Sequence, residues 1–186
     1  VCDGPVWALR CSGRGLVATG GSDGVVCVRH VNSLARRLIA SGSYIYNEAT
    51  DSLSLLGHTG PILDASWAED DNQSPHSLLV SVSADKTARL WRVVFESGSP
   101  WDDESPASSP SSSLQGNGGS TRSAQCVMYF GHGGAVFASC FVTKDTFATG
   151  GMDRVLRLWH VPSGRPTSWA HCNDAITSIA VSGLTR

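Results

Sequence analysis

The apolar positions of this chain lie in short runs typical of β-strands rather than in long helical patterns. Residues 61–67 and 135–141 are two such runs, each rich in β-branched, aromatic or small residues and bounded by Gly or Pro. No stretch keeps the 3.6-residue apolar period of an amphipathic helix. We therefore predict an all-β fold, and in the best-marked unit we expect strands at 135–141, 146–150, 155–161 and 166–169.

One local pattern recurs along the chain: an apolar pair, a Ser or Thr, small residues, and then an Asp in a turn. In two copies a Trp follows the Asp at the same offset, from Asp85 to Trp91 and from Asp153 to Trp159. A recurring internal offset indicates one repeated supersecondary unit, so the chain is a repeat array. The copies lie at 16–24, 79–86 and 147–154, Gly-His pairs precede two of them at 57–58 and 131–132, and Ala170-His171 is expected to open a further unit.

These residues resemble the WD40 repeat family, in which Gly-His, a Ser or Thr, an Asp and a closing Leu-Trp mark each unit. The resemblance implies a β-propeller with four-stranded blades of about 40 residues. Propellers of this family often have about seven blades, so we expect an incomplete propeller of about three blades and the start of a fourth. The expected blades are 1–56, 57–130 and 131–169, and the fourth starts at 170–186.

Polar insertions interrupt the pattern in three places. The second unit is longer than the third between its Gly-His and its Ser or Thr, and the polar stretch 69–77 is the expected site of the extra residues. Residues 97–123 are rich in Ser, Pro and Gly, so we predict a disordered insert that cannot bury enough apolar surface to fold. A further extension spans 32–50. The resemblance implies that all three insertions lie on one face of the propeller.

A His, a hydroxyl residue and an Asp occur at matching positions of the second and third units, a composition shared with hydrolase triads. Their repetition argues against catalysis, because one active site does not need a copy in every repeat. The resemblance implies instead a buried network in which the Asp accepts from the His, the His contacts the hydroxyl, and the hydroxyl binds the Trp indole. The residues are His58, Ser81, Asp85 and Trp91, and His132, Thr149, Asp153 and Trp159.

The first unit departs from this pattern. Thr19 and Asp23 are present, but Cys2 occupies the position of the His and Arg29 that of the Trp. We therefore expect the first blade to be the least stable of the three.

Composition narrows the classes of function. The 186 residues include 14 Lys and Arg against 16 Asp and Glu, a net charge of -2, without the basic cluster that nucleic-acid binding normally needs. No apolar run approaches the roughly 18 residues of a membrane helix, and the residues from Val1 do not resemble a signal peptide. The six cysteines form no CxxC pair, so we expect reduced thiols, no metal and no cofactor, in an intracellular protein of the cytoplasm or nucleus.

Rigid blades that position variable loops favour binding rather than catalysis. We expect a non-catalytic scaffold for other proteins or peptides, without a small-molecule ligand. The alternatives are a substrate-recruiting subunit of a multiprotein enzyme complex, such as a ubiquitin ligase, and a propeller enzyme, for which no carboxylate pair or nucleotide loop stands out. The candidate partner-binding residues are Ser22, Gly24, Ala84, Lys86, Met152 and Arg154 beside the turn aspartates, and Trp101 in the Ser-rich insert.

Overall fold

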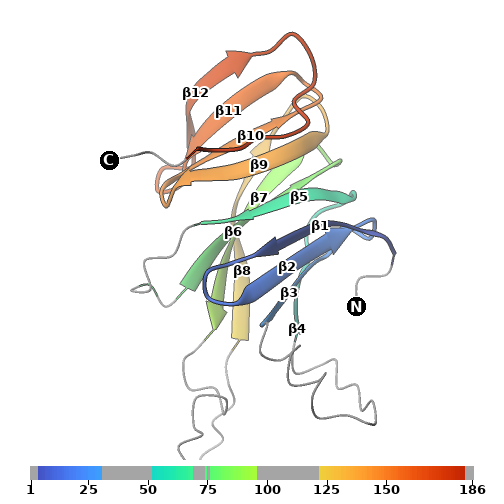
Figure 1. Cartoon of the computed structure of the whole chain (residues 1–186), viewed down its shortest axis with the longest axis vertical. Helices are drawn as coiled ribbons and strands as arrows, with labels where there is room; N and C mark the ends of the chain where they lie inside the picture. Colours follow the sequence, from blue (N-terminus) through green and yellow to red (C-terminus); the bar gives the residue numbers. More distant parts are fainter. Residues whose placement is uncertain (1–3, 31–51, 69–73, 75, 96–121, 183–186) are drawn as a thin grey trace, which may run out of the picture.

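The computed structural model describes residues 4–30, 52–68, 74, 76–95 and 122–182. All regular secondary structure in these residues is β-strand, arranged as three four-stranded antiparallel sheets (Figure 1). In each sheet the strands lie side by side in the order in which they occur in the chain. The all-β prediction is therefore confirmed.

Each sheet uses four consecutive strands. Sheet 1 contains β1 (Val6–Cys11), β2 (Leu16–Gly21), β3 (Val26–His30) and β4 (Ser52–Leu55). Sheet 2 contains β5 (Ile62–Trp67), β6 (His76–Ser83), β7 (Thr87–Phe95) and β8 (Arg122–Gly131). Sheet 3 contains β9 (Val136–Thr143), β10 (Thr146–Gly151), β11 (Val155–His160) and β12 (Arg165–His171).

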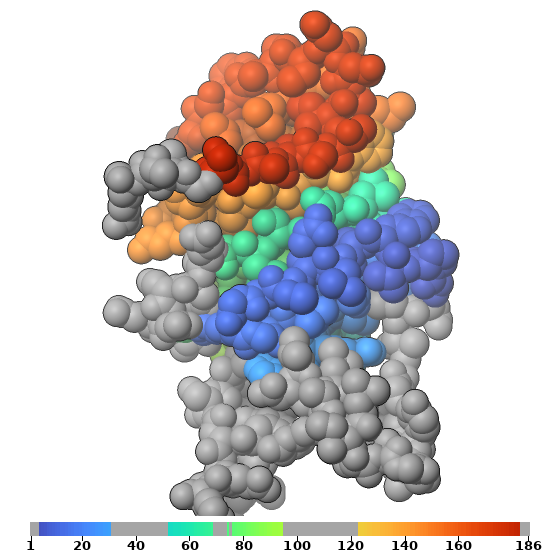
Figure 2. Space-filling model, in the orientation of Figure 1, coloured from blue at the N-terminus to red at the C-terminus, as the bar shows by residue number. Residues whose placement is uncertain are grey.

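Sheet 2 lies between sheets 1 and 3 and packs on both, so the sheets form successive layers (Figure 2). Adjacent residues of a strand point to opposite faces of its sheet. Accordingly, β6 sends Leu79 into the core shared with sheet 1 and Val80 into the core shared with sheet 3. Trp91 fills the first core and Phe147 the second, and burying each large side chain contributes about 1.5–3 kcal/mol.

Two glycines allow neighbouring layers to approach closely. A Cβ atom on Gly20 would lie 2.6 Å from Cγ2 of Ile62, and one on Gly150 would lie 2.7 Å from Cγ2 of Ile176. Both distances are far shorter than the about 3.5–4.0 Å of a favourable carbon contact. Ile176 therefore packs on sheet 3 as Ile62 packs on sheet 1, although residues 173–182 contain no strand.

The strands of sheet 3 lie within two residues of the predicted ones at every end. The predicted insert 97–123 is too long, however, because β8 begins at Arg122. The reason is that β7 extends to Phe95 and pairs Phe95 with Arg122 and Val94 with Ser123. Polar residues can pair in the strand ladder because its hydrogen bonds are formed by the backbone and do not require apolar side chains.

A similar correction applies to the predicted insertion 69–77. β6 begins at His76, inside this stretch, because His76 pairs with Val94 of the long strand β7. Most of the predicted insertions lie outside the described residues, at 31–51, 69–73, 75 and 96–121.

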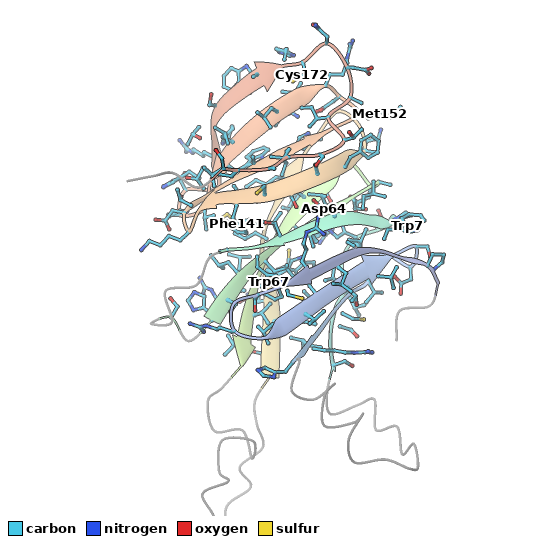
Figure 3. All side chains as sticks on the ribbon, in the orientation of Figure 1. Trp7, Asp64, Trp67, Phe141, Met152 and Cys172 are labelled. Atoms are coloured by element: carbon cyan, nitrogen blue, oxygen red, sulfur yellow. The ribbon has the colours of Figure 1, made fainter. Side chains whose placement is uncertain are left out.

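The connections between strands divide the sheets into two ends. The turns between the second and third strands, at 22–25, 84–86 and 152–154, lie at one end together with the linkers that join the sheets. We call this end the turn face. Met152 and Trp7 lie toward it on the right-hand side of Figure 3. The other connections of each antiparallel sheet leave from the opposite end.

Asp64 on β5 links all three sheets. Its Oδ1 accepts a hydrogen bond from Nη2 of Arg10 in β1 at 2.7 Å, and its Oδ2 accepts one from the backbone N–H of Ser139 in β9 at 3.0 Å. Two residues further along β5, the Ser66 hydroxyl oxygen accepts from the backbone N–H of Phe141 at 3.1 Å. Because the Asp64 side chain is only 12% exposed, its carboxylate depends on these donors.

Replacing Asp64 should cost more than removing its ion-pair partner. We expect Asp64→Ala to lower the free energy of unfolding by about 1–3 kcal/mol, because the buried Ser139 N–H loses its acceptor. Arg10→Ala should cost less than about 1 kcal/mol, because that side chain is 52% exposed and solvent screens the pair. Urea unfolding of the whole chain measures both values, and equal losses would contradict the assignment.

Candidate functional site

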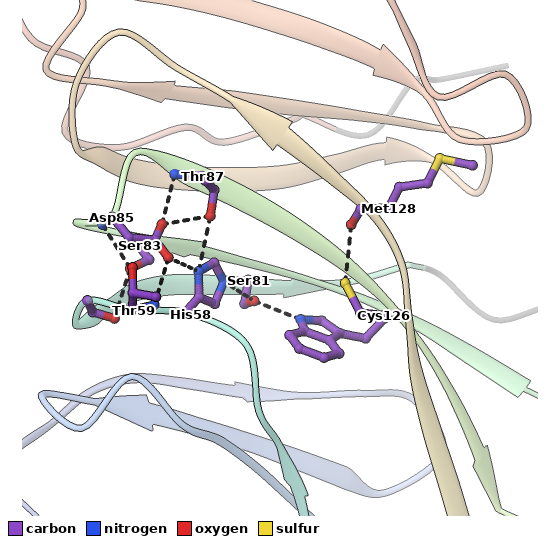
Figure 4. A network of polar contacts seen from close by, with 10 residues as sticks. His58, Thr59, Ser81, Ser83, Asp85, Thr87, Cys126 and Met128 are labelled. Carbon is purple, nitrogen blue, oxygen red and sulfur yellow. Dashed lines mark hydrogen bonds and ion pairs between the residues drawn. The ribbon is translucent and has the colours of Figure 1, made fainter.

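A buried polar network ties the linker before sheet 2 to the strands of that sheet (Figure 4). Nδ1 of His58 lies 2.8 Å from Oδ2 of Asp85, and Nε2 lies 2.8 Å from Oγ of Ser81. The indole Nε1–H of Trp91 donates to the same hydroxyl oxygen at 2.8 Å. The His58 side chain is 1% exposed. The structure thus brings together all four residues that the sequence placed in this set.

The donors and acceptors of this chain fit one protonation pattern. A carboxylate can only accept, so Nδ1 of His58 carries a proton and donates it to Asp85. The other nitrogen of a neutral imidazole accepts, so the Ser81 hydroxyl donates to Nε2 and accepts from Trp91. This arrangement satisfies the buried indole, hydroxyl and imidazole groups at once.

Asp85 also organises the turn in which it lies. Its Oδ1 accepts from the backbone N–H of Thr87 at 2.9 Å and from the Thr87 hydroxyl at 2.6 Å. Its Oδ2 accepts from the backbone N–H of Thr59 in the linker at 3.0 Å. Ser83 contributes as well, because its hydroxyl donates to the Gly60 carbonyl at 2.9 Å. The sequence interpretation missed Thr59, Ser83 and Thr87, since their turn and linker positions carry no distinctive spacing.

Sheet 3 holds a second network with one replacement. Nε2 of His132 lies 2.8 Å from Oγ1 of Thr149, which accepts from the indole N–H of Trp159 at 2.7 Å. Nδ1 of His132 lies 3.1 Å from Oδ2 of Asp153. Nη1 of Arg157 lies 2.5 Å from the same carboxylate oxygen and 2.6 Å from Nδ1 of His132.

Arg157 takes over part of the role that Thr87 has in sheet 2. The residue that matches Thr87 is Val155, which has no hydroxyl and offers Asp153 only its backbone N–H, at 3.2 Å. The guanidinium supplies the missing donor to the carboxylate. A guanidinium only donates, so the tautomer of His132 decides whether Nδ1 donates to Asp153 or accepts from Arg157.

The two aspartates are held in the ionised state. Burial alone would raise the pKa of each, but hydrogen bonds outweigh burial. Donors from Thr87, His58 and Thr59 lower the pKa of Asp85 below its usual value of 3.8. Donors from Arg157, Gly133 and Val155 lower the pKa of Asp153 to about 2.

The two histidines are held neutral. Burial lowers the pKa of His58 below its usual 6.5, the Asp85 carboxylate opposes this, and Arg89 reinforces it. Burial also lowers the pKa of His132, and the positive charge of Arg157 adds to the effect. A neutral imidazole between a charged Asp and a hydroxyl serves as a structural bridge at neutral pH.

Sheet 1 lacks this arrangement in its described part. The backbone N–H of Val25 donates to Oδ1 of Asp23 at 3.1 Å, so the aspartate still shapes its own turn. Arg29 occupies the position of the Trp, and the predicted His position, Cys2, lies outside the described residues. The expectation that this blade is the least stable remains a prediction.

The register corrects the position of the fourth Gly-His equivalent. The backbone N–H of His132 donates to the Lys86 carbonyl, and that of Cys172 donates to the Arg154 carbonyl in the same way, both at 2.8 Å. Cys172, not His171, therefore matches His132. His171 pairs with Val155 at the end of β12, so the predicted start at Ala170-His171 is one residue too early.

The candidate partner-binding residues differ in accessibility. Ser22, Lys86, Met152 and Arg154 are exposed on the turn face, whereas Ala84 is half-buried. Gly24 is a correction: it is buried, because the carbonyl oxygens of His58 and Gly60 would lie 3.2 and 3.0 Å from a Cβ atom there. Trp101 lies outside the described residues.

Four-stranded antiparallel sheets that stack face to face, with a buried His clamped between a turn Asp and a strand hydroxyl, define the blades of a β-propeller. The family model of the WD domain, G-beta repeat (WD40), matches residues 50–92 and 124–160. These two segments are therefore WD40 repeats, and the resemblance noted in the sequence is confirmed.

Relatives agree with this assignment. The chain is 30% identical over 115 residues to WD repeat-containing protein 44 of Xenopus laevis, a match that covers 61% of this chain and 9% of that protein. A chain in the crystal structure of the mitotic checkpoint complex superposes with a TM-score of 0.60 at 16% identity, over 94% of this chain and 40% of that one. The second likeness shows the fold alone.

The part of the chain that the structure describes contains neither a metal-binding group of side chains nor a membrane-spanning helix. No group of three or more His, Cys, Asp or Glu side chains is placed to hold a metal ion there. That part also contains no helix with the length and apolar character needed to cross a membrane.

Removing the turn aspartate of sheet 3 should destabilise the fold. We expect Asp153→Ala to lower the free energy of unfolding by about 1–3 kcal/mol, because Gly133, Val155 and Arg157 lose their acceptor. Asp145→Ala is the matched control, since that aspartate is exposed in another turn. Urea unfolding of both variants checks this, and an unchanged midpoint for Asp153→Ala would rule out the network.

Stability should also depend on pH through the buried histidines. The pKa values of His58 and His132 are lower in the folded state than the unfolded value of 6.5. The stability that the neutral histidines contribute is therefore complete above pH 6.5. It is lost as the pH falls below 6.5 through the folded values. We expect the free energy of unfolding to drop between about pH 7 and pH 5. His160→Gln, outside the networks, should keep this slope, and a flat profile in the unaltered chain would contradict the burial of neutral histidines.

Proposed function

We propose that this chain is part of a non-catalytic scaffold that binds other proteins or peptides at its turn face. WD40 repeats typically serve as protein-interaction scaffolds, and their blades are generally non-catalytic. The structural relative is a chain of a multiprotein complex, which supports protein partners without naming those of this chain. The networks described above hold the turns and linkers of this face in fixed positions, as a recognition surface requires.

The backbone of two exposed residues carries the proposal. Lys86 and Arg154 adopt positive φ angles of 71° and 61°, and the matching residue of sheet 1 is Gly24 at 73°. A residue with a Cβ atom pays about 1 kcal/mol or more in this left-handed region, where Gly is unstrained. Two neighbouring blades thus keep a long cationic side chain at a cost in stability. Strain that is retained at exposed positions supports a role in binding.

The surroundings of these cations indicate the chemistry of the partner. Met152, beside Arg154, is 63% exposed and offers a flexible apolar contact. Ser22 offers a hydroxyl on sheet 1, and Ala84 offers a small contact beside Lys86 on sheet 2. Two cations with an adjacent apolar side chain suit an acidic or phosphorylated segment that also carries a hydrophobic residue.

Glycine substitutions separate stability from binding at this face. We expect Lys86→Gly with Arg154→Gly to leave the free energy of unfolding unchanged or to raise it by up to about 1 kcal/mol, because Gly relieves the backbone strain. The same variant should lose partners in affinity purification followed by mass spectrometry. Arg92→Gly with Lys144→Gly, at exposed positions away from the turn face, is the control and should keep the partners.

The identity of the partners distinguishes the two roles that the sequence left open. Partners that disappear with the glycine variant support the scaffold. If subunits of a ubiquitin ligase or another enzyme complex are among them, the chain is a substrate-recruiting subunit. Partners that persist in the variant at unchanged yield would contradict binding at the turn face.

A further inference from the structure

Sheet 3 has a groove on its outer strands that neither the networks nor the turn face explains. Its volume is about 260 Å³. Cross-strand pairs form its walls: Arg157 of β11 lies opposite Trp169 of β12, and Trp159 lies opposite Pro166. The six lining residues are Val155, Arg157 and Trp159 on β11, and Pro166, Trp169 and His171 on β12.

The groove lies on the face of sheet 3 that points toward sheet 2. Trp159 marks this face, because its ring packs on Phe130 of β8 with centroids 4.7 Å apart. Ile176 packs on Gly150 on the opposite face, since Gly150 follows Thr149, which binds Trp159. A further layer that continued from Ile176 would therefore leave the groove open.

Sheet 2 has residues at the positions that match the groove of sheet 3, but its linker occupies the space there. Arg89 lies opposite Tyr129 as Arg157 lies opposite Trp169. There the linker covers the site, because a Cβ atom on Gly57 would lie only 2.5 Å from Nη1 of Arg89. A Cβ atom on Gly131, the matching residue at the end of β8, would meet no heavy atom within 4 Å. The groove is thus a property of sheet 3 rather than of every blade.

The lining combines apolar surface with positive charge. Trp169 is 65% exposed, a large indole that is left in contact with water. Arg157 lines the groove with a side chain that is 23% exposed, and its hydrogen bonds to Asp153 and His132 in the described part of the chain use Nη1. No carboxylate is among the six lining residues. Asp153 pairs with Nη1 but does not line the groove, so the guanidinium is the charged group of the lining and favours an occupant with a carboxylate.

The size and the edge strand further define how an occupant binds. The groove is smaller than the about 300–1,000 Å³ of a typical small-molecule pocket, so it suits a single large side chain. Pro166 has no N–H to donate, which disfavours the addition of a continuous strand along β12. The occupant is expected to insert a side chain rather than to extend the sheet.

We propose that this groove binds a segment of a partner protein that inserts one large apolar side chain against Trp169 and places an adjacent carboxylate on Arg157. The site is a second surface of the scaffold, separate from the turn face. Neither Lys86 nor Arg154 lines the groove, so the glycine variant at the turn face should bind the segment unchanged.

Short synthetic peptides test the groove directly on the whole chain. The probes are acetyl-Gly-Leu-Asp-Glu-Gly-amide and its Phe and Trp versions, with a Ser version and an Asn-Gln version as controls. The readout is the indole N–H signal of Trp169 in the 1H–15N NMR spectrum, assigned by its loss in Trp169→Phe. We expect saturable shifts with the apolar acidic peptides, and binding weaker by about ten-fold or more with either control.

Variants at matched positions separate binding from folding. Trp169→Ser, followed by backbone amide signals because it lacks the indole, should weaken peptide binding by about ten-fold or more. Tyr129→Ser, at the same register position of sheet 2, should leave the affinity unchanged. Arg157→Gln should remove the preference for Asp-Glu over Asn-Gln; if it unfolds, the salt dependence of peptide binding in the unaltered chain gives the same information.

Three results would overturn the proposal. The first is no saturable shift at about 5 mM peptide, a concentration that detects even millimolar affinity. The second is binding that survives Trp169→Ser. The third is a shift of the Trp169 signal with protein concentration alone, which would make a second copy of the chain the occupant. If any of these results is found and the glycine variant at the turn face still loses its partners, the scaffold proposal stands.

Discussion

The structure depends on a buried imidazole held between a carboxylate and a hydroxyl. His58 comes from the linker before sheet 2, Asp85 from a turn, and Ser81 from the strand before that turn. The same carboxylate closes its own turn through Thr87. One aspartate thus fixes the turn, the linker and, through the imidazole and hydroxyl, the Trp91 indole in the core between sheets. Buried polar groups such as these must form hydrogen bonds with one another, because an unpaired polar group costs much free energy at low local dielectric.

This constraint explains how three packed sheets can present a turn face with fixed geometry. The networks immobilise the turns and linkers, so the residues between them can vary and can even be strained. Lys86 and Arg154 occupy backbone conformations that Gly prefers, on turns whose aspartates are anchored from below. In sheet 3, Val155 stands where sheet 2 has Thr87, and Arg157, which also lines the outer groove, donates to Asp153.

Sequence reasoning reached the layers and the networks because both are repeated. A constant spacing between Asp and Trp identifies the repeated unit. The pattern of apolar residues along β6 and β9 depends on whether one or both faces of the strand are buried. It did not reach features that depend on tertiary pairing. The start of β8 at Arg122 follows from the length of β7, the bridge of Asp64 to Arg10 and Ser139 joins separate sheets, and the burial of Gly24 depends on a neighbouring linker. The shift from His171 to Cys172 is a register effect that residue identity conceals.

The most direct test of this account is the protonation state of His58 in the whole chain at neutral pH. Long-range 1H–15N NMR correlations report which ring nitrogens carry protons. The account predicts a neutral ring with the proton on Nδ1, which donates to Asp85, and an unprotonated Nε2, which accepts from Ser81. An imidazolium ion, or a neutral ring with its proton on Nε2, would contradict the network on which the turn face depends.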